Sequence, residues 1–216
     1  MEIYNPAEDS YLLAEVVKNY LNNLIKDIKK KDKRNSEQHK NSKPYNQDGD
    51  INYTKIKGLK ILDMGSGSGI QALICRQLGY KNILAADIDS TAIAHLKKQK
   101  IRTIKTNLFS NIDNKEKFDI IIFNPPYLPE HKYDKKPDTT AGKQGYELII
   151  KFLKQAKNYL NKNNKRSNIL LLFSSLSHPE IIKQKARQLG YEYKLLGKKS
   201  LFFEQLYVYN LFLKAS

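Results

Sequence analysis

The chain has 216 residues, a formal net charge of +16 at pH 7 and a single cysteine, Cys75. This length suits one sizeable hydrophobic core, so we expect a single domain over residues 1–216. The sequence has no apolar run of about 18 residues, no N-terminal signal pattern and no second cysteine for a disulfide. These properties argue against a helical membrane protein, a secreted protein and a disulfide-stabilised one, and they predict a protein of the reducing cytoplasm.

The positive charge is compatible with a nucleic-acid partner but does not favour one. Only five of the 38 basic residues are arginines, which leaves 33 lysines (38 − 5). Paired contacts to phosphate or guanine favour arginine over lysine. A solvated, lysine-rich surface explains the charge equally well.

The N-terminal segment has apolar residues at helical spacing from Leu12 to Leu24. Together with the capping pattern of Asn5-Pro6 and Glu8, this spacing predicts an amphipathic helix over 6–26. From about 27 to 57 the chain is rich in lysine and asparagine and has almost nothing to bury. We expect a disordered insertion there.

After residue 58, short apolar runs alternate with helical patterns. The expected strands are 60–64, 82–86, 101–105, 118–123 and 168–173, and the expected helices are 69–79, 90–99, 145–160 and 178–189. Such alternation is typical of a parallel sheet covered on both faces. Two further strands, 191–196 and 201–213, are joined only by 197–200, which permits an antiparallel pair. We therefore expect an α/β fold: a doubly wound, mostly parallel seven-stranded sheet that ends in an antiparallel hairpin.

The first expected strand runs directly into a glycine loop, Gly65-Ser66-Gly67-Ser68-Gly69. Glycines at this turn let the backbone approach a ligand at the switch point of a doubly wound sheet. Asp63 precedes the loop, where a carboxylate would repel a pyrophosphate but complement an ammonium or sulfonium group. This favours S-adenosylmethionine over a dinucleotide, with Gly65 and Gly67 contacting the donor.

Two more positions are candidates for the donor site. Asp87 ends the second strand and can accept both ribose hydroxyl protons, whereas Asp89, with Ser90, fits better as the cap of the next helix. After the third strand come Asn107 and Leu108, where the Asn107 amide oxygen can accept from an adenine amino group. A polar residue that merely ends the strand is the alternative for Asn107.

The fourth strand leads into Asn124-Pro125-Pro126-Tyr127. Amide and aromatic amine nitrogens are poor nucleophiles because their lone pairs are delocalised. The Asn124 side-chain oxygen and the Pro125 carbonyl can accept the two hydrogens and aim the nitrogen, while Tyr127 stacks on the planar group. This is catalysis by orientation without a strong base, so Asn124, Pro125 and Tyr127 are the predicted catalytic and substrate-binding residues. A rigid strand exit is the alternative, which the glycine loop in the same sheet disfavours.

Several segments together resemble one known family. They are residues 3–10, 63–69, 124–127, 141–145 and 202–206. The chain resembles the compact archaeal and eukaryotic branch of the HemK-like protein-(glutamine N5) methyltransferases, whose catalytic domain has the class I (Rossmann-like) methyltransferase fold.

This resemblance implies N5-methylation of the glutamine in the Gly-Gly-Gln loop of a class I translation termination factor. It also implies donor contacts by Ser10, Asp63, Gly65, Asp87, Asn107 and Leu108, with Asn124 contacting donor and glutamine. Two departures stand out: relatives usually have an acidic residue at position 107, and segment 141–145 lacks a glycine common among them.

The resemblance further implies a small zinc-binding activator protein. Residues 101–105 are the expected sheet edge, and an open edge is a docking site for another strand. Basic residues on an edge also serve to prevent pairing, so the residues leave this partner open. We assign no metal ligand in this chain, because His39, His95, His131 and His178 lack ligand spacing.

Three other functions remain open on the residues alone. An adenine-N6 methyltransferase acting on DNA or RNA has the same planar, two-hydrogen target, although base flipping usually needs extra surface. A protein lysine methyltransferase matches a planar clamp less well. A non-catalytic basic scaffold would not require Asp63, Asp87 and Asn124 together.

Overall fold

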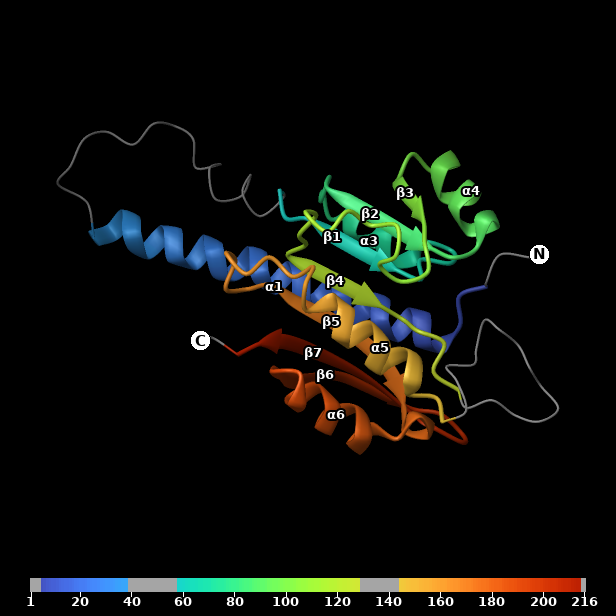
Figure 1. Ribbon diagram of the computed structural model, residues 1–216. Helices are drawn as coiled ribbons and strands as arrows, with labels where there is room; N and C mark the ends of the chain where they lie inside the picture. Colours follow the sequence, from blue (N-terminus) through green and yellow to red (C-terminus); the bar gives the residue numbers. More distant parts are fainter. Residues whose placement is uncertain (1–4, 39–57, 129–143, 215–216) are drawn as a thin grey trace.

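The computed structural model describes residues 5–38, 58–128 and 144–214. Its centre is a seven-stranded sheet with the order β3-β2-β1-β4-β5-β7-β6 (Figure 1). The strands are β1 (Ile61–Met64), β2 (Ile83–Asp87), β3 (Arg102–Lys105), β4 (Ile120–Phe123), β5 (Asn168–Ser174), β6 (Tyr191–Ser200) and β7 (Gln205–Leu213). β1 to β5 pair in parallel, and β7 pairs antiparallel with both β5 and β6. The predicted fold class is confirmed.

Helices cover both faces of this sheet. They are α1 (Glu8–Gln38), α3 (Ile70–Gln77), α4 (Ser90–Lys98), α5 (Glu147–Ala156) and α6 (Pro179–Gln188), with a short 3-10 helix, η1 (Ser175–Ser177). In Figure 1, α5 and α6 lie in front of the sheet and α1 lies behind it. None of the described helices combines the length and apolar character needed to cross a membrane.

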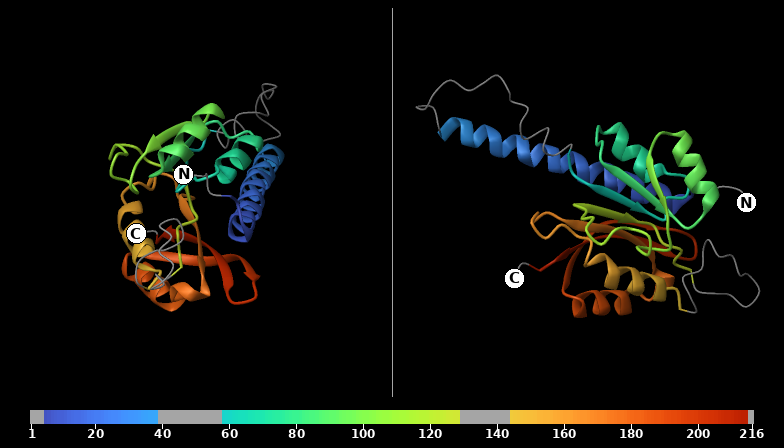
Figure 2. Two further views of the ribbon diagram at one scale, coloured as in Figure 1. Left: turned by 90° about the vertical axis from the view of Figure 1, so that its right-hand side faces the viewer. Right: turned by 45° about the horizontal axis from the view of Figure 1, so that its top comes forward.

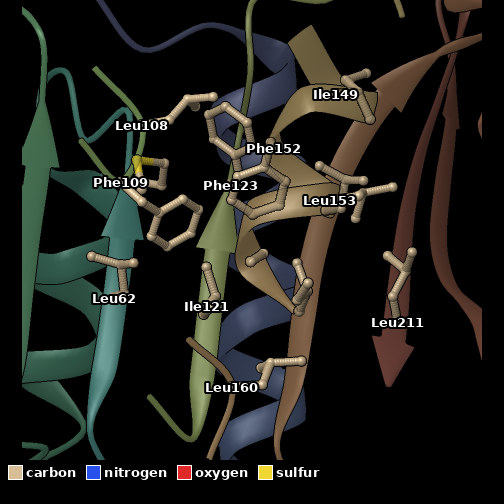
Figure 3. Packing of buried hydrophobic residues seen from close by; sticks show 14 of the residues in the cluster. Leu62, Leu108, Phe109, Ile121, Phe123, Ile149, Phe152, Leu153, Leu160 and Leu211 are labelled. Carbon is tan, nitrogen blue, oxygen red and sulfur yellow. The ribbon is translucent and has the colours of Figure 1, made fainter. Parts of the chain in front are cut away.

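Two hydrophobic clusters form because successive strand residues face opposite sides of the sheet. Leu62 and Ile121 face the cluster beneath α5 and α6, whereas Ile61 and Ile120 face the one beneath α1, α3 and α4. Figure 3 shows the first cluster, where the rings of Phe123 and Phe152 lie 4.4 Å apart between centroids. The sheet is thus buried on both faces, which explains its continuous apolar strands.

The carboxyl ends of the parallel strands meet where the chain changes direction in the sheet. From β1 the chain adds β2 and β3 on one side, and then crosses to β4 and β5 on the other. Doubly wound sheets bind ligands in the crevice outside such a switch point. The loops after β1, β2, β3 and β4 therefore converge there.

The first helix is longer than expected. α1 continues to Gln38, so the expectation of disorder was wrong for residues 27–38. This stretch contains no glycine or proline and several lysines, which are good helix formers, so nothing ends the helix after Lys26. Figure 2 shows α1 running along one face of the sheet and reaching past it.

The terminal hairpin turns later than expected. β6 continues through Ser200, with a register shift between Leu195 and Gly197, and the turn is formed by 201–204. Gly197 is therefore a paired strand residue, directly after the bulge at Leu196, rather than part of the connection. A side-chain carbon at Gly197 would lie 2.6 Å from a methyl carbon of Val16 in α1, so close packing explains this glycine.

Three predicted features lie outside the described residues. They are residues 39–57 of the expected insertion, residues 3 and 4 of the N-terminal motif, and residues 141–143 of the 141–145 segment.

Candidate active site

The glycine loop after β1 adopts the backbone that its sequence predicts. Gly65, Gly67 and Gly69 have φ values of 62°, 50° and 80°, a region that disfavours side chains. A side-chain carbon at Gly65 would lie 3.3 Å from the Phe123 ring and 3.8 Å from the Asn124 carbonyl oxygen. The loop thus lies directly against the beginning of the 124–127 segment.

Asp63 is a buried carboxylate at the root of this loop. It is 2% exposed, and it accepts a hydrogen bond from the backbone N–H of Ala72 in α3 at 3.1 Å. Burial raises the pKa of Asp63 from 3.8 to about 7; the Ala72 hydrogen bond opposes this rise and negative Asp87 adds to it. Burial thus raises the pKa of Asp63 more than the hydrogen bond lowers it. A cationic ligand beside Asp63 would stabilise the ionised carboxylate and would be held by it.

Asp87, at the end of β2, organises the loops around it. One carboxylate oxygen accepts from the Gly67 N–H at 2.7 Å and the other from the Asp89 N–H at 2.9 Å. Asp89 itself accepts from the Thr91 N–H at 2.8 Å and is the N-cap of α4, which confirms its predicted capping role. Asp87 is left as the carboxylate that faces the glycine loop.

The turn after β3 lies beside Asp87. The Thr106 N–H donates to the Asp87 carbonyl at 2.7 Å, and the Thr106 hydroxyl donates to the Leu108 carbonyl at 3.0 Å. Leu108 has a positive φ of 51° and a buried side chain, whereas Asn107 is exposed. A leucine is uncommon in this backbone region, and such strain is frequent at ligand sites.

Asn124 is fixed by the start of α1. Its side-chain amide donates to a carboxylate oxygen of Asp9 at 3.0 Å and approaches the Ser10 hydroxyl oxygen at 3.4 Å. The other Asp9 oxygen accepts from the Ser10 N–H at 2.6 Å. The Asn124 side-chain oxygen is buried and has no hydrogen-bond partner. The donor side of the amide is therefore anchored while its acceptor side is left for a ligand.

The rest of the tetrad is held by η1. Pro125 is buried, and Tyr127 is partly buried against both hydrophobic clusters. The Ser177 hydroxyl donates to the Tyr127 carbonyl at 2.8 Å. The strand exit at Asn124 is thus fastened to α1 on one side and to η1 on the other.

The structure brings together every predicted site residue: Ser10, Asp63, Gly65, Gly67, Asp87, Asn107, Leu108, Asn124, Pro125 and Tyr127 lie at the carboxyl edge of β1 to β4 or on the start of α1, which packs against it. Two positioning residues were missed. Asp9 lies within segment 3–10, but only its neighbour Ser10 was predicted to contact the donor. Gln71, which donates to the Ser10 carbonyl at 3.0 Å, is an amide in an otherwise apolar helix turn.

A separate hollow lies at the opposite edge of the sheet. Its volume is about 510 Å³, and it lies between α1, the start of β5 and the end of β7. Its lining includes Tyr20, Lys30, Arg166, Asn168 and Asn210. None of the predicted site residues lines it, so we do not assign the chemistry to this hollow.

Comparison with known proteins decides the family. A model of the methyltransferase small domain matches residues 52–189. The chain belongs to this methyltransferase family. A relative from Methanocaldococcus jannaschii, named "Putative protein N5-glutamine methyltransferase", is 31% identical over 97% of this chain and 91% of its own length. That match places the chain in the HemK-like branch that the motifs predicted.

Two other similarities are partial or structural. A release factor glutamine methyltransferase from Rhodopirellula baltica is 30% identical, and the match covers 47% of this chain and 40% of that protein. The fold is similar to a methyltransferase chain in the Mtq2–Trm112 complex of E. cuniculi, described as methylating the termination factor eRF1. This likeness has a TM-score of 0.66 and 17% identity, and it covers 99% of this chain and 100% of the other.

Enzymes of this family take the methyl group from S-adenosyl-L-methionine, and the residues present fit that donor. Asp63 is a carboxyl group buried away from water, so the donor's positive charge would stabilise its ionised form. The crowding at Gly65 shows that glycine lets the loop pack directly against Phe123 and Asn124, which brings the loop beside the Asn124 segment. Asp63, Asp87, Ser10 and the glycine loop would hold the donor.

Proposed function

We propose that this enzyme methylates the side-chain nitrogen (N5) of the glutamine in the Gly-Gly-Gln loop of a class I translation termination factor. The observation that carries the proposal is the half-anchored amide of Asn124. Its nitrogen is held by Asp9, and its buried oxygen has no partner. A buried acceptor without a partner costs roughly 1–3 kcal/mol, which a ligand N–H recovers.

A primary amide is the acceptor that best matches this arrangement. Its nitrogen carries two hydrogens in one plane, and the Asn124 oxygen and the adjacent Pro125 carbonyl are two acceptors next to each other in the chain. Holding both hydrogens leaves the nitrogen directed at the methyl group. A lysine ammonium carries three hydrogens in a tetrahedral arrangement and fits two acceptors less well.

The donor supplies a methyl group on positively charged sulfur. When bound, the donor would supply this methyl group to the amide nitrogen with its neutral thioether as the leaving group, and the proton that the nitrogen loses would pass to water. Asn124 and Pro125 orient the amide, and Tyr127 provides a flat surface for it. Orientation of this kind lowers the barrier without a strong base.

The relatives support the same substrate class. The Rhodopirellula protein is named as a release factor glutamine methyltransferase, and the E. cuniculi complex is described as methylating a termination factor. A substrate that takes part in translation would also place this enzyme in the cytoplasm.

A methyl-transfer assay tests the proposal. Purified enzyme with a labelled donor is expected to label the termination factor, but not the same factor with its loop glutamine replaced by alanine. Equal labelling of both factors contradicts the glutamine assignment. Preferential labelling of adenine-containing oligonucleotides would instead identify an adenine-N6 methyltransferase, the function that the charge of +16 leaves open.

We also propose that a small zinc-binding activator adds a strand to β3. In the described sheet β3 is the terminal strand and pairs only with β2, so its other edge is open to a partner. The E. cuniculi relative is a complex with a second protein, Trm112.

Hydrogen exchange tests this docking mode. Adding the purified activator is expected to slow amide exchange in residues 102–105 at the edge of the sheet. Slowed exchange in β6 without any change in β3 would contradict this docking mode, because it would place the activator at the opposite edge of the sheet.

A further inference from the structure

Exposed apolar side chains gather at one end of this molecule. Among the described residues, six large hydrophobic side chains are exposed, namely Tyr11, Ile88, Leu176, Leu195, Phe202 and Phe203. Tyr11 lies at the start of α1, and Ile88 and Leu176 follow the carboxyl ends of β2 and β5. With Phe202 and Phe203 in the β6–β7 turn, five of the six therefore lie at the active-site edge. The exception is Leu195, within β6. Scattered exposed hydrophobics need no explanation, whereas a group around an active site indicates a binding surface.

The most exposed members are Phe202 and Phe203, with 92% and 84% of their surface accessible. They form the tip of the β6–β7 turn, and their rings meet edge to face with centroids 4.6 Å apart. The turn is closed by a hydrogen bond from the Leu201 N–H to the Glu204 carbonyl at 2.8 Å. Two adjacent phenylalanines in water are unfavourable unless a partner covers them.

Hydrogen bonds and an ion pair tie this tip to the active site on two sides. On one side, the Gln205 N–H donates to the Ser175 hydroxyl at 2.9 Å, and Ser177 of the same short helix donates to the Tyr127 carbonyl. On the other side, Lys199 forms an ion pair with Glu8, the residue before Asp9. The tip therefore contacts the same two elements that hold the Asn124 segment, η1 through hydrogen bonds and the start of α1 through an exposed ion pair.

Packing fixes the hairpin behind the tip as well. Gly197, directly after the bulge, lies so close to Val16 of α1 that a side-chain carbon there would overlap a Val16 methyl group. β6 and β7 pair along nine registered positions up to Ser200 and Gln205. A rigid, pre-formed apolar tip loses little conformational entropy when it binds.

We propose that Phe202 and Phe203 form a docking platform that captures the protein substrate beside its methyl-accepting loop. This inference rests on the proposed function, since it requires a protein rather than a small molecule as acceptor. A glutamine side chain is small enough to contact only the Asn124 segment, so a protein that presents it must also contact the surface next to that segment. The platform fits an apolar patch on the substrate, close to the acceptor loop.

Charge near the tip narrows the chemistry of that patch. Lys198 is exposed directly before the Lys199–Glu8 ion pair, two residues from the end of β6 at the tip. Beside the phenylalanines, one Glu204 carboxylate oxygen is buried without a hydrogen-bond partner and can accept from a donor. The substrate patch is therefore expected to be apolar, with acidic side chains at its rim.

The sheet topology separates this platform from the activator edge. β3 and β6 are the two opposite edges of the described sheet. An activator on β3 would leave the β6–β7 tip uncovered. The substrate protein, in contrast, must come to the carboxyl edge where the tip lies.

The test compares the double variant F202S/F203S with the control variant Leu195→Ser, which removes an exposed apolar side chain elsewhere on the same hairpin. Both are assayed as the full chain together with any activator that co-purifies. Calorimetry with the demethylated donor product present measures the Kd for the termination factor. Kinetic assays give kcat and KM for methyl transfer, and the Kd for the donor and the thermal midpoint are measured separately.

F202S/F203S is expected to raise both the Kd and the KM for the termination factor by about 10-fold or more, since central aromatic contacts dominate interfaces. The kcat and the donor Kd are expected to stay within about 2-fold, and the thermal midpoint is expected to be unchanged. For Leu195→Ser the kcat, the donor Kd and the Kd and KM for the factor are all expected to stay within about 2-fold, with an unchanged thermal midpoint. Unchanged Kd and KM for the factor overturn the platform, and so does a parallel loss of donor binding or stability. A wild-type enzyme that binds the factor but transfers no methyl group contradicts the proposed function and leaves the platform measurable by Kd.

Discussion

Two buried carboxylates at opposite ends of neighbouring strands are treated in opposite ways. Asp119, just before β4, accepts from the Lys60 N–H at 2.9 Å and from the side-chain amides of Asn161 and Asn164 at 2.8 Å each. Asp63, near the end of β1, accepts from the Ala72 N–H and has a pKa raised to about 7. Asp119 has the full set of partners expected of a structural residue, whereas Asp63 accepts one hydrogen bond and has a raised pKa that a cationic ligand would lower.

The same contrast holds for two asparagines. Asn161 donates its amide to Asp119 within the loop that closes the amino edge, and its carbonyl and side-chain oxygens accept from Ser167 and Asn163. Asn124 donates in a similar way to Asp9, but its oxygen is buried without a partner. Partners are complete around Asp119 and Asn161 and incomplete at Asn124, which is the physical difference between a residue that stabilises the fold and one placed to bind a ligand.

The largest expected effect is on catalysis. Asn124→Ala should lower kcat for methyl transfer by about 1000-fold, because an oriented acceptor for the reacting amide is lost, while donor affinity changes by less than about 3-fold. Asn161→Ala is the matched control at the structural end and should keep kcat within about 2-fold. Comparable losses of kcat in both variants would abolish the distinction between the two ends.

The structural end should respond in stability instead. Asp119→Ala leaves three hydrogen-bond donors without their acceptor, so the free energy of unfolding should fall by about 3 kcal/mol. Urea denaturation measures this change, and activity per folded molecule should be unaltered. A loss of donor affinity in Asp119→Ala would instead assign that carboxylate to the site.

Substitution of Asp63 is expected to weaken donor binding while it stabilises the donor-free fold. Asp63→Asn is expected to weaken donor binding at pH 8 by about 30-fold, since the negative charge beside the positive donor is lost. In the donor-free enzyme the same variant should be more stable than the wild type at pH 8, because a desolvated charge is removed. Calorimetry and thermal unfolding measure the two effects, and weaker stability together with unchanged affinity would contradict this role.

The sign of the pH dependence follows from the raised pKa. Below pH 4 Asp63 is protonated in both the folded and unfolded states, and between pH 4 and about 7 the folded state binds the extra proton. The stability linked to Asp63 is therefore present at low pH and is lost as the pH rises to about 7. Donor-free wild type minus Asp63→Asn should show this downward trend, and an upward trend would mean that the pKa is lowered.

The smallest effect is expected at Asp9. Asp9→Ala frees the Asn124 amide to rotate, which should lower kcat by about 10-fold without changing the thermal midpoint by more than a few degrees. Glu8→Ala is the neighbouring control, because its exposed ion pair with Lys199 contributes little. An equal loss of kcat in both variants would point to a general disturbance of the helix start.

Much of this site was predictable because its residues follow directly from strands. β1, β2, β4 and β5 are short apolar runs buried on both faces, and Asp63, Asp87 and Asn124 stand at or next to the strand ends. Local sequence therefore specifies both the strand and the residue placed at its edge. The family motifs added the glutamine, which spacing alone does not distinguish from adenine.

The features that were missed depend on contacts distant in sequence. Asp9 meets Asn124 across 115 positions, so no local pattern reveals the pairing. Residues 197–200 have the composition of a turn, but they pair with β7 and Gly197 packs against Val16 of α1, so the turn lies at 201–204. The helix beyond Lys26 has the composition of a disordered segment and continues for lack of a residue that ends it.

The most direct test of the account is to locate the methyl group. Tandem mass spectrometry of the termination factor after reaction with wild-type enzyme should find one methyl group on the side-chain nitrogen of the Gly-Gly-Gln glutamine, and none after reaction with Asn124→Ala. A methyl group on a lysine, or an Asn124→Ala enzyme that still modifies the glutamine, would contradict the assignment of Asn124 as the residue that orients a glutamine amide.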